Sequence, residues 1–143
     1  MNVRIKRFDK SLPLPERKTA GAAAFDLTAR EAVTIAPGAI GYVPLNVAME
    51  IPAGHFLLVA ARSGTHKRGL MMANGIGIID PDFSGDTDEI NGAYYNFTGA
   101  PVIVEKGERI AQATFVPIAT FAWEDVGRLE NKDRGAFGTT GRM

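Results

Sequence analysis

The sequence contains no cysteine, so the chain can form neither a disulfide framework nor a thiolate metal site. It also lacks an excess of one charge, because 16 lysines and arginines balance 16 aspartates and glutamates. A formal net charge of zero gives no general electrostatic attraction to nucleic acid or to a membrane surface. We therefore expect no stable nucleic-acid partner.

Long apolar runs are missing as well. No run approaches the length that crosses a membrane, and the N-terminus lacks the apolar core of a signal peptide. We expect a soluble, cytoplasmic protein with no membrane partner. The 143 residues, 45% hydrophobic and 22% charged, suit one globular domain with a sizeable core.

What the sequence has in abundance is short β-strand patterns separated by turn residues. The clearest alternation runs over residues 43–51 and predicts one strand with a single buried face, which Pro44 places at a sheet edge or a bulge. Residues 56–59 are apolar enough for a strand covered on both faces. Further strands are expected at residues 3–6, 25–28, 93–97, 102–104, 109–116 and 121–126, and one helical turn within 65–72. This pattern predicts an all-β sandwich, jelly roll or barrel.

The character of the chain changes after Gly127. Residues 128–143 are polar, rich in glycine, threonine and arginine, and carry a local excess of two positive charges. A disordered terminus is one interpretation. Phe137 argues against it, because a single aromatic side chain in a flexible tail has a use only if its ring stacks on another group. We expect a β domain over residues 1–127 and a flexible C-terminal arm over residues 128–143.

Residues 75–86 are the first candidate for chemistry. An apolar run leads to Asp80, and turn residues then reverse the chain, which is typical of the tip of a β-hairpin. Asp82 and Gly85 are more simply surface-turn residues. Asp80 follows the apolar run directly, so we expect it at the floor of a pocket, where desolvation can make a carboxylate a base.

Two segments could bind phosphate. Residues 62–64 (RSG) offer a guanidinium, a hydroxyl and a close backbone approach, although such a tripeptide is more often a plain strand end. Residues 135–141 could wrap phosphate with backbone N–H groups. Gln112 is a polar residue inside a strand, where a solvated face is the simpler explanation. Together with Asp80, these features indicate a nucleotide hydrolase, and composition and spacing do not specify the nucleotide.

Five motifs, in order along nearly the whole chain, resemble those of the homotrimeric dUTP pyrophosphatase family. They are residues 23–27 (AAFDL), 62–64 (RSG), 74 with 77–85 (N and GIIDPDFSG), 107–112 (GERIAQ) and 133–141 (DRGAFGTTG). The family fold is a jelly-roll-like distorted barrel, in agreement with the strand pattern. The acidic insertion at residues 86–89 is similar to a branch of bacterial and phage members, and so implies a bacterial or phage-encoded protein.

The resemblance implies Mg²⁺-assisted hydrolysis of dUTP to dUMP and pyrophosphate, by water attack on the α-phosphorus. Active sites would be shared between the subunits of a homotrimer. Asp80 would bond the 3′-hydroxyl and position the water, and Phe83 would pack on the deoxyribose. Arg62, Ser63 and Gly64 would contact the phosphates, and Gln112 would hold a phosphate or the water. Asn74, Gly77 and Ile78 would recognise the uracil, and Asp26 would contact the Mg²⁺–water shell. The residues that would close over the nucleotide are Arg134, Phe137, Gly138 and Thr139.

The chain departs from the family pattern in four places. Ala24 replaces a usual glycine, Thr65 an apolar residue and Phe83 the commoner tyrosine, and the fifth motif is two residues short. A dCTP deaminase, which shares the fold, is the alternative enzyme, but it needs a glutamate where this chain has Ala93. A partner-binding trimer without catalysis is the other alternative. Against it stands the presence together of the four residues expected to act on the nucleotide, which are Asp80, Ser63, Arg62 and Gln112.

Overall fold

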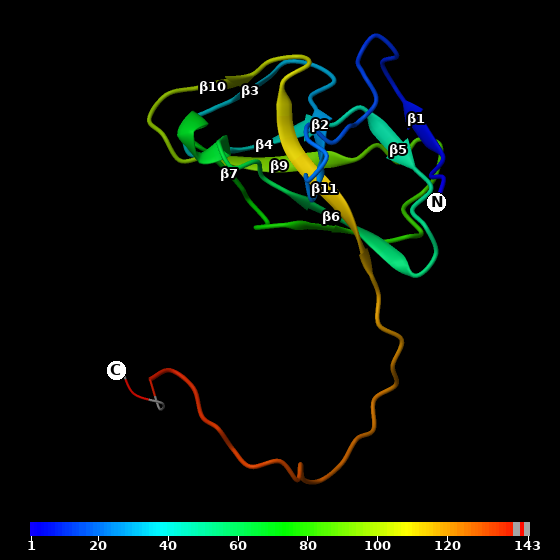
Figure 1. Ribbon diagram of the computed structural model, residues 1–143. Coiled ribbons are helices and arrows are strands. Elements are labelled where there is room, and N and C mark those ends of the chain that lie inside the picture. The colour runs from blue at the N-terminus through cyan, green and yellow to red at the C-terminus, as the bar shows by residue number, and fades with distance from the viewer. Residues whose placement is uncertain (139–140, 142–143) are drawn as a thin grey trace.

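The computed structural model describes residues 1–138 and residue 141, and Figure 1 shows that β-strands dominate it. The strands are β1 (Ile5–Arg7), β2 (Phe25–Thr28), β3 (Val33–Ile35), β4 (Ile40–Pro44), β5 (Val47–Met49), β6 (His55–Ala60), β7 (Leu70–Met72), β8 (Gly77–Ile79), β9 (Asn91–Asn96), β10 (Val102–Val104) and β11 (Arg109–Pro117). The 3₁₀ helix η1 (Thr65–Arg68) is the one helix of this described part. No described helix has the length and apolarity needed to cross a membrane. The expected jelly-roll-like, all-β fold class is confirmed.

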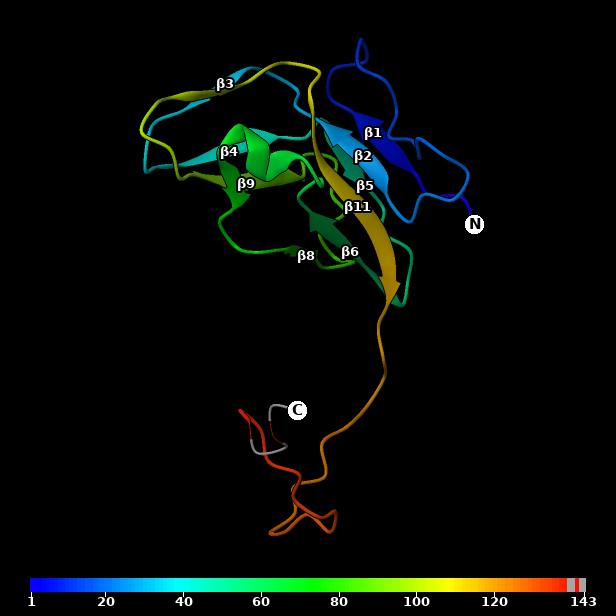
Figure 2. The same cartoon turned by 60° about the vertical axis from the view of Figure 1, so that its left-hand side comes forward.

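Two antiparallel sheets enclose the core. The first has the strand order β2-β11-β6-β8 and the second the order β4-β9-β7. Leu57 and Val59 of the first sheet and Leu70 and Tyr94 of the second belong to one buried apolar cluster. The pairs β3–β10 and β1–β5 lie at opposite ends of the body (Figures 1 and 2). The two sheets therefore share one core, and the face of each sheet that points away from this core is available for contacts with other molecules.

Tyr94 links the two sheets through the core. Its ring is fully buried, and its hydroxyl donates a hydrogen bond to the carbonyl oxygen of Ile110 at 2.6 Å. Burial raises the pKa of the Tyr94 hydroxyl well above its ordinary value, so this group remains a neutral donor. A Cβ at Gly92 would come within 2.5 Å of the tyrosine ring, which explains the glycine there.

The prediction of a single strand over residues 43–51 is wrong. The chain breaks at Asn46, whose φ of 72° lies in the left-handed region that asparagine tolerates better than most residues. The Asn46 side chain is buried and exchanges hydrogen bonds with the backbone of Asp9. Residues 43–49 are all buried, so the single buried face is also wrong, whereas the edge position of Pro44 is confirmed because β4 pairs only with β9.

Three other strand predictions fail. Residues 75–86 do not form a hairpin tip, because β8 pairs with β6 while β9 pairs with β4 and β7. Residues 121–126 form no strand, since β11 ends at Pro117 and the chain then leaves the body without a neighbour to pair with (Figure 1). Strand β6 is fully covered on one face only, with Phe56 and Leu58 half-buried on the other. The helical turn within residues 65–72 is confirmed as η1.

Glu89 anchors the acidic segment 86–89 to the body. Its carboxylate accepts two hydrogen bonds from Arg30, at 2.8 and 3.1 Å, and one from the backbone N–H of Asn46 at 2.9 Å. Asp86 instead pairs with Lys6 at the exposed surface. Glu89 thus joins three distant segments, whereas Asp86 makes a solvated contact.

We expect Glu89→Ala to lower the free energy of unfolding by about 2 kcal/mol, because it removes charge-assisted bonds and leaves the buried N–H of Asn46 without its acceptor. Urea denaturation followed by circular dichroism measures this change. The matched control, Asp86→Ala, should cost no more than about 0.5 kcal/mol because its ion pair is exposed. Equal losses for the two variants would contradict the anchoring role.

Candidate active site

The strand order brings together residues from three separate motifs. β11 lies between β2 and β6, so Gln112 faces Asp26 on one side and Ala60 on the other. The alternate residues of these strands point into the core, which directs the Asp26 and Gln112 side chains to the outer face of the sheet. Because β6 ends at Ala60, residues 62–64 leave the sheet beside them.

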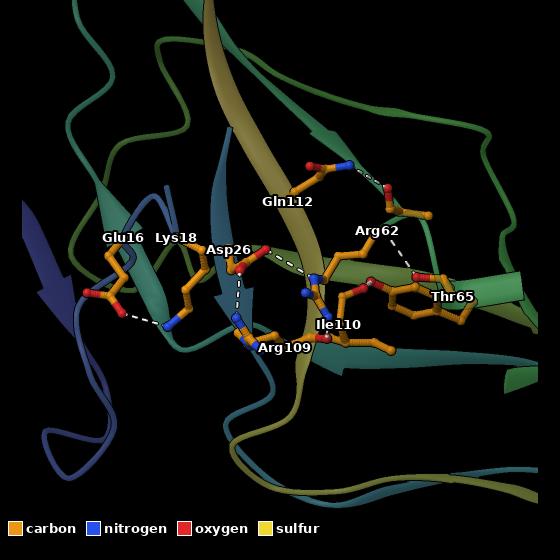
Figure 3. A network of polar contacts seen from close by, with 10 residues as sticks. Glu16, Lys18, Asp26, Arg62, Thr65, Arg109, Ile110 and Gln112 are labelled. Carbon is orange, nitrogen blue, oxygen red and sulfur yellow. Dashed lines mark hydrogen bonds and ion pairs between the residues drawn. The ribbon is translucent and has the colours of Figure 1, made fainter. Parts of the chain in front are cut away.

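Asp26 holds two arginines (Figure 3). Its carboxylate oxygens accept hydrogen bonds from Nε of Arg62 at 3.1 Å and from Nη1 of Arg109 at 3.3 Å. Arg62 also donates from Nη1 to the carbonyl oxygen of Arg109 at 3.3 Å. Two guanidinium groups against one carboxylate leave a net positive charge, so this cluster orders its arginines and still attracts an anion.

Arg109 had no role in the sequence interpretation, and a β-bulge explains why. Arg109 pairs with Thr28 and Ala111 with Leu27, so β11 carries one extra residue between them. A strict alternation from Gln112 would turn Arg109 towards the core. The bulge reverses this direction and brings Arg109 to the Asp26 carboxylate.

Backbone contacts fix the loop after β6. Oγ1 of Thr65 accepts a hydrogen bond from the N–H of Arg62 at 3.1 Å, and the Thr65 N–H donates to the Arg62 carbonyl oxygen at 3.1 Å. The side-chain amide nitrogen of Gln112 donates to the carbonyl oxygen of Ala61 at 3.0 Å. Residues 63–64 lie exposed between these fixed points. Thr65, which departs from the family pattern, therefore has a structural use here.

A pocket of about 210 Å³ opens beside this loop. It is lined by Arg62, Gly64, Thr65, Arg68, Glu108, Arg109 and Ile110. Arg68 is ion-paired with Glu108 and donates to the carbonyl oxygen of Ile103, which ties η1 to the β10–β11 turn. The pocket therefore carries three arginines against one glutamate, and hydrogen bonds hold its walls, a combination that suits an anion.

The second group of predicted residues lies on β8 and in the turns beside it. Gly77 and Ile78 belong to β8, an edge strand that pairs, within the part of the chain that the structure describes, with β6 alone and so leaves the backbone polar groups of its other edge free. Asn74 is exposed in the preceding turn, and Phe83 is exposed in the following one. Asp80 is exposed too, so its expected place at a pocket floor is wrong for the single chain, because β8 is the last strand of its sheet.

The two groups lie far apart within one chain. Gln112 pairs with Ala60, whereas Asp80 follows Ile79, the partner of Leu57. Two strand spacings of ~4.8 Å and ~4 residues at ~3.3 Å put their backbones about 16 Å apart. Both side chains leave the same face roughly perpendicular to the sheet, so they cannot converge on one water molecule within a chain.

The tail approaches neither group. Arg134, Phe137 and Gly138 are exposed in a segment that extends away from the sheets (Figures 1 and 2). Thr139, also predicted to contact the nucleotide, lies outside the described residues. No cluster of three or more histidine or acidic side chains that could hold a metal ion occurs in residues 1–138 and 141.

The structure is an all-β protein of the jelly-roll class that gathers two arginines, an amide and a carboxylate on the outer face of one sheet. The sequence model of the dUTPase family matches residues 10–141, and the chain belongs to this family. The deoxyuridine 5′-triphosphate nucleotidohydrolase of Desulfitobacterium hafniense (strain DSM 10664 / DCB-2) is 42% identical, over 94% of this chain and 91% of that protein.

Solved structures show the same similarity. The dUTPase of Streptococcus mutans is 31% identical with a TM-score of 0.75, over 83% of this chain and 98% of that chain. The G164S dUTPase of Staphylococcus bacteriophage 80alpha, solved with dUpNHpp, is 24% identical with a TM-score of 0.85, over 98% of both chains. At that identity the phage structure supports the fold.

We expect Arg62→Gln to weaken binding of inorganic tripolyphosphate about tenfold, the effect of losing one charge-assisted contact. Isothermal titration calorimetry measures the affinity. Arg17→Gln, which removes an equal charge from an exposed residue outside the cluster, is the control and should bind as the parent does. Equal weakening in both variants would mean that only overall charge matters.

Proposed function

We propose that this protein hydrolyses dUTP to dUMP and pyrophosphate. Its membership of the dUTPase family and the name of the Desulfitobacterium relative support this substrate. The observation that carries the proposal is the arginine pair held by Asp26 beside Gln112. Phosphoryl chemistry depends on fixed donors that stabilise charge on the phosphate oxygens, and this cluster supplies them.

The phosphate chain binds along the loop after β6 in this proposal. Arg62 neutralises the phosphate oxygens, and Ser63 and Gly64 contact the chain near the bond that breaks. Gln112 holds the α-phosphate or the attacking water. The fixed loop supports these roles, because donors that are already oriented need no reorganisation when the reaction occurs.

The nucleoside end binds along β8. Asn74 and the backbone of Gly77 and Ile78 read the uracil edge, which the free edge of β8 supports. Phe83 packs on the deoxyribose and excludes a 2′-hydroxyl. Asp80 bonds the 3′-hydroxyl and positions the water that attacks the α-phosphorus, as general base chemistry requires.

We also propose that the active sites are shared between the subunits of a homotrimer. The separation of about 16 Å supports this, because Asp80 of one chain can meet Gln112 only of another. The same docking covers the exposed carboxylate and excludes water from the reaction. The arm, residues 128–143, closes the site, with Phe137 on the uracil and with Arg134, Gly138 and Thr139 over the phosphates.

Mg²⁺ enters with the nucleotide in this proposal, because phosphate oxygens and water are its preferred ligands. Asp26 would contact the ion through a water molecule and not directly, since each of its carboxylate oxygens already accepts a hydrogen bond from an arginine. When bound, the ion supplies further neutralisation of the phosphates. A cytoplasmic location follows from the proposed nucleotide substrate.

Pyrophosphate release from dUTP tests the proposed reaction, and ammonia release from dCTP tests the alternative deaminase. We expect Asp80→Asn to bind dUTP almost normally and to lose turnover by about 100-fold, the scale of acid–base and water positioning. Near-parental turnover would remove Asp80 from the mechanism.

Mixing Asp80→Asn with Gln112→Ala, each expected to lose turnover alone because it removes one proposed group of the site, tests the shared site. Trimers that combine Asp80→Asn chains with Gln112→Ala chains contain sites with both native residues. Equal random mixing should restore about a quarter of parental activity, since each site then draws its two groups from independent chains. Mixed trimers confirmed by mass spectrometry that stay inactive would contradict sharing.

Phe83→Ala should raise the catalytic efficiency for UTP relative to dUTP, because the ring face no longer blocks the 2′-hydroxyl. Pyrophosphate release measured with each nucleotide gives the ratio. An unchanged ratio would place sugar discrimination elsewhere in the site.

A further inference from the structure

The turn after β8 carries two of the residues proposed to act on the nucleotide, Asp80 and Phe83. β8 has three residues and is the last strand of its sheet, so the strand alone gives this turn limited support. The N–H of Phe83 donates a hydrogen bond to the carbonyl oxygen of Asp80 at 3.0 Å, which closes a β-turn with Pro81 at its second position. Asp80 and Phe83 therefore belong to one unit, and contacts with the rest of the body set its place.

Ser84 connects this turn to the core. Its hydroxyl donates a hydrogen bond to the carbonyl oxygen of Pro81 and accepts one from the N–H of Ile51 at 3.3 Å. Ile51 follows β5 and is buried in the apolar cluster that the two sheets share. A serine hydroxyl has one donor and two acceptor positions, so one side chain can make both contacts at once.

The contact with Ile51 distinguishes Ser84 from an ordinary turn residue. Serine hydroxyls in turns commonly bond the backbone a few residues away, and the bond to Pro81 is of this local kind. Ile51 lies 33 positions away along the chain, so the second bond is tertiary. The Ser84 hydroxyl thus joins the turn to a buried segment of the body.

A second contact of the same segment is weaker. The backbone and carboxylate oxygens of Asp86 accept hydrogen bonds from Nζ of Lys6, and this pair is exposed to solvent. Exposed ion pairs add little, because water screens them and two long side chains must be ordered. Loss of the Ser84 hydroxyl instead takes away the acceptor of the Ile51 N–H beside the core. Ser84 therefore provides the firmer attachment of the two.

We propose that Ser84 is a positioning residue for the hydrolysis, because its hydroxyl fixes the turn that carries Asp80 and Phe83. This inference rests on the function proposed above. Without the hydroxyl the turn moves relative to Ile51, and the two side chains move with it. The carboxylate that positions the attacking water and the ring that packs on the sugar then shift together. A displacement of ~1 Å far from the reacting atoms can cost about 100-fold in rate.

Ser84→Ala tests this role because it removes the hydroxyl and keeps both acting side chains. We expect kcat for dUTP to fall about tenfold and KM to change less than about threefold, since a misplaced turn affects the reacting geometry more than overall binding. The catalytic efficiency for UTP relative to dUTP should rise about threefold, because the ring of Phe83 is displaced as well. Pyrophosphate release with each nucleotide measures these values.

Two further variants are controls. Ser84→Thr keeps a hydroxyl at the same position and should retain the parental turnover and nucleotide ratio. Ser11→Ala removes a serine hydroxyl whose bond to Asp9 is exposed and local, so it should match the parent. Circular dichroism checks that each variant is folded. Ser84→Cys, whose thiol is a weak donor and acceptor, decides the question if Ser84→Ala does not fold.

Amide hydrogen exchange of the nucleotide-free protein reports the attachment without reference to catalysis. In Ser84→Ala we expect faster exchange at Ile51, which loses its acceptor, and at Phe83, whose turn is no longer held. Exchange at Ala113, in the middle of β11 between β2 and β6, should stay at the parental rate.

Parental turnover in Ser84→Ala would overturn the proposal, as would a Ser84→Thr chain as slow as Ser84→Ala. A loss of turnover with an unchanged nucleotide ratio would also overturn it, because Phe83 would then not have moved with Asp80. A parent that releases no pyrophosphate from dUTP would refute the proposed hydrolysis, while exchange at Ile51 and Phe83 would still decide whether Ser84 holds the turn.

Discussion

The pairing of β11 with β2 and β6 at the same time is the constraint on which the candidate site depends. It sets Asp26, Gln112 and Ala60 in one register across three strands. Because Arg62 follows Ala60 closely and reaches Asp26, parts of three motifs that are distant in the chain meet. The bulge in β11 then adds Arg109 to the same face. A one-residue slip of this register would turn Asp26 or Gln112 into the core.

The electrostatics of the cluster follow from that register. Asp26 lies within reach of two guanidinium groups, and its single negative charge orders both without neutralising both. Arginine side chains lose considerable conformational entropy when they are fixed. Because Asp26 fixes them in the free protein, less ordering remains for the binding of a phosphate chain.

The sequence predicted much of the fold but not its breaks. Residues 25–28 and 102–104 form strands with the predicted bounds, because alternation and turn residues are local signals. The break at Asn46 could not be predicted in this way, since its left-handed backbone is stabilised by the distant Asp9. Residues 121–126 have strand character, but no strand in the described residues, 1–138 and 141, pairs with them.

The sequence by itself determined the all-β class and the chemical groups available for the reaction, because strand period and residue type are properties of short segments. Only the tertiary structure decided which of these groups meet. It placed Arg62, Arg109 and Gln112 around Asp26, and it held Asp80, just after the edge strand β8, about 16 Å from Gln112. The physical reason is that a strand pattern specifies which face a side chain takes, whereas pairing between strands, and the bulges within them, set its neighbours.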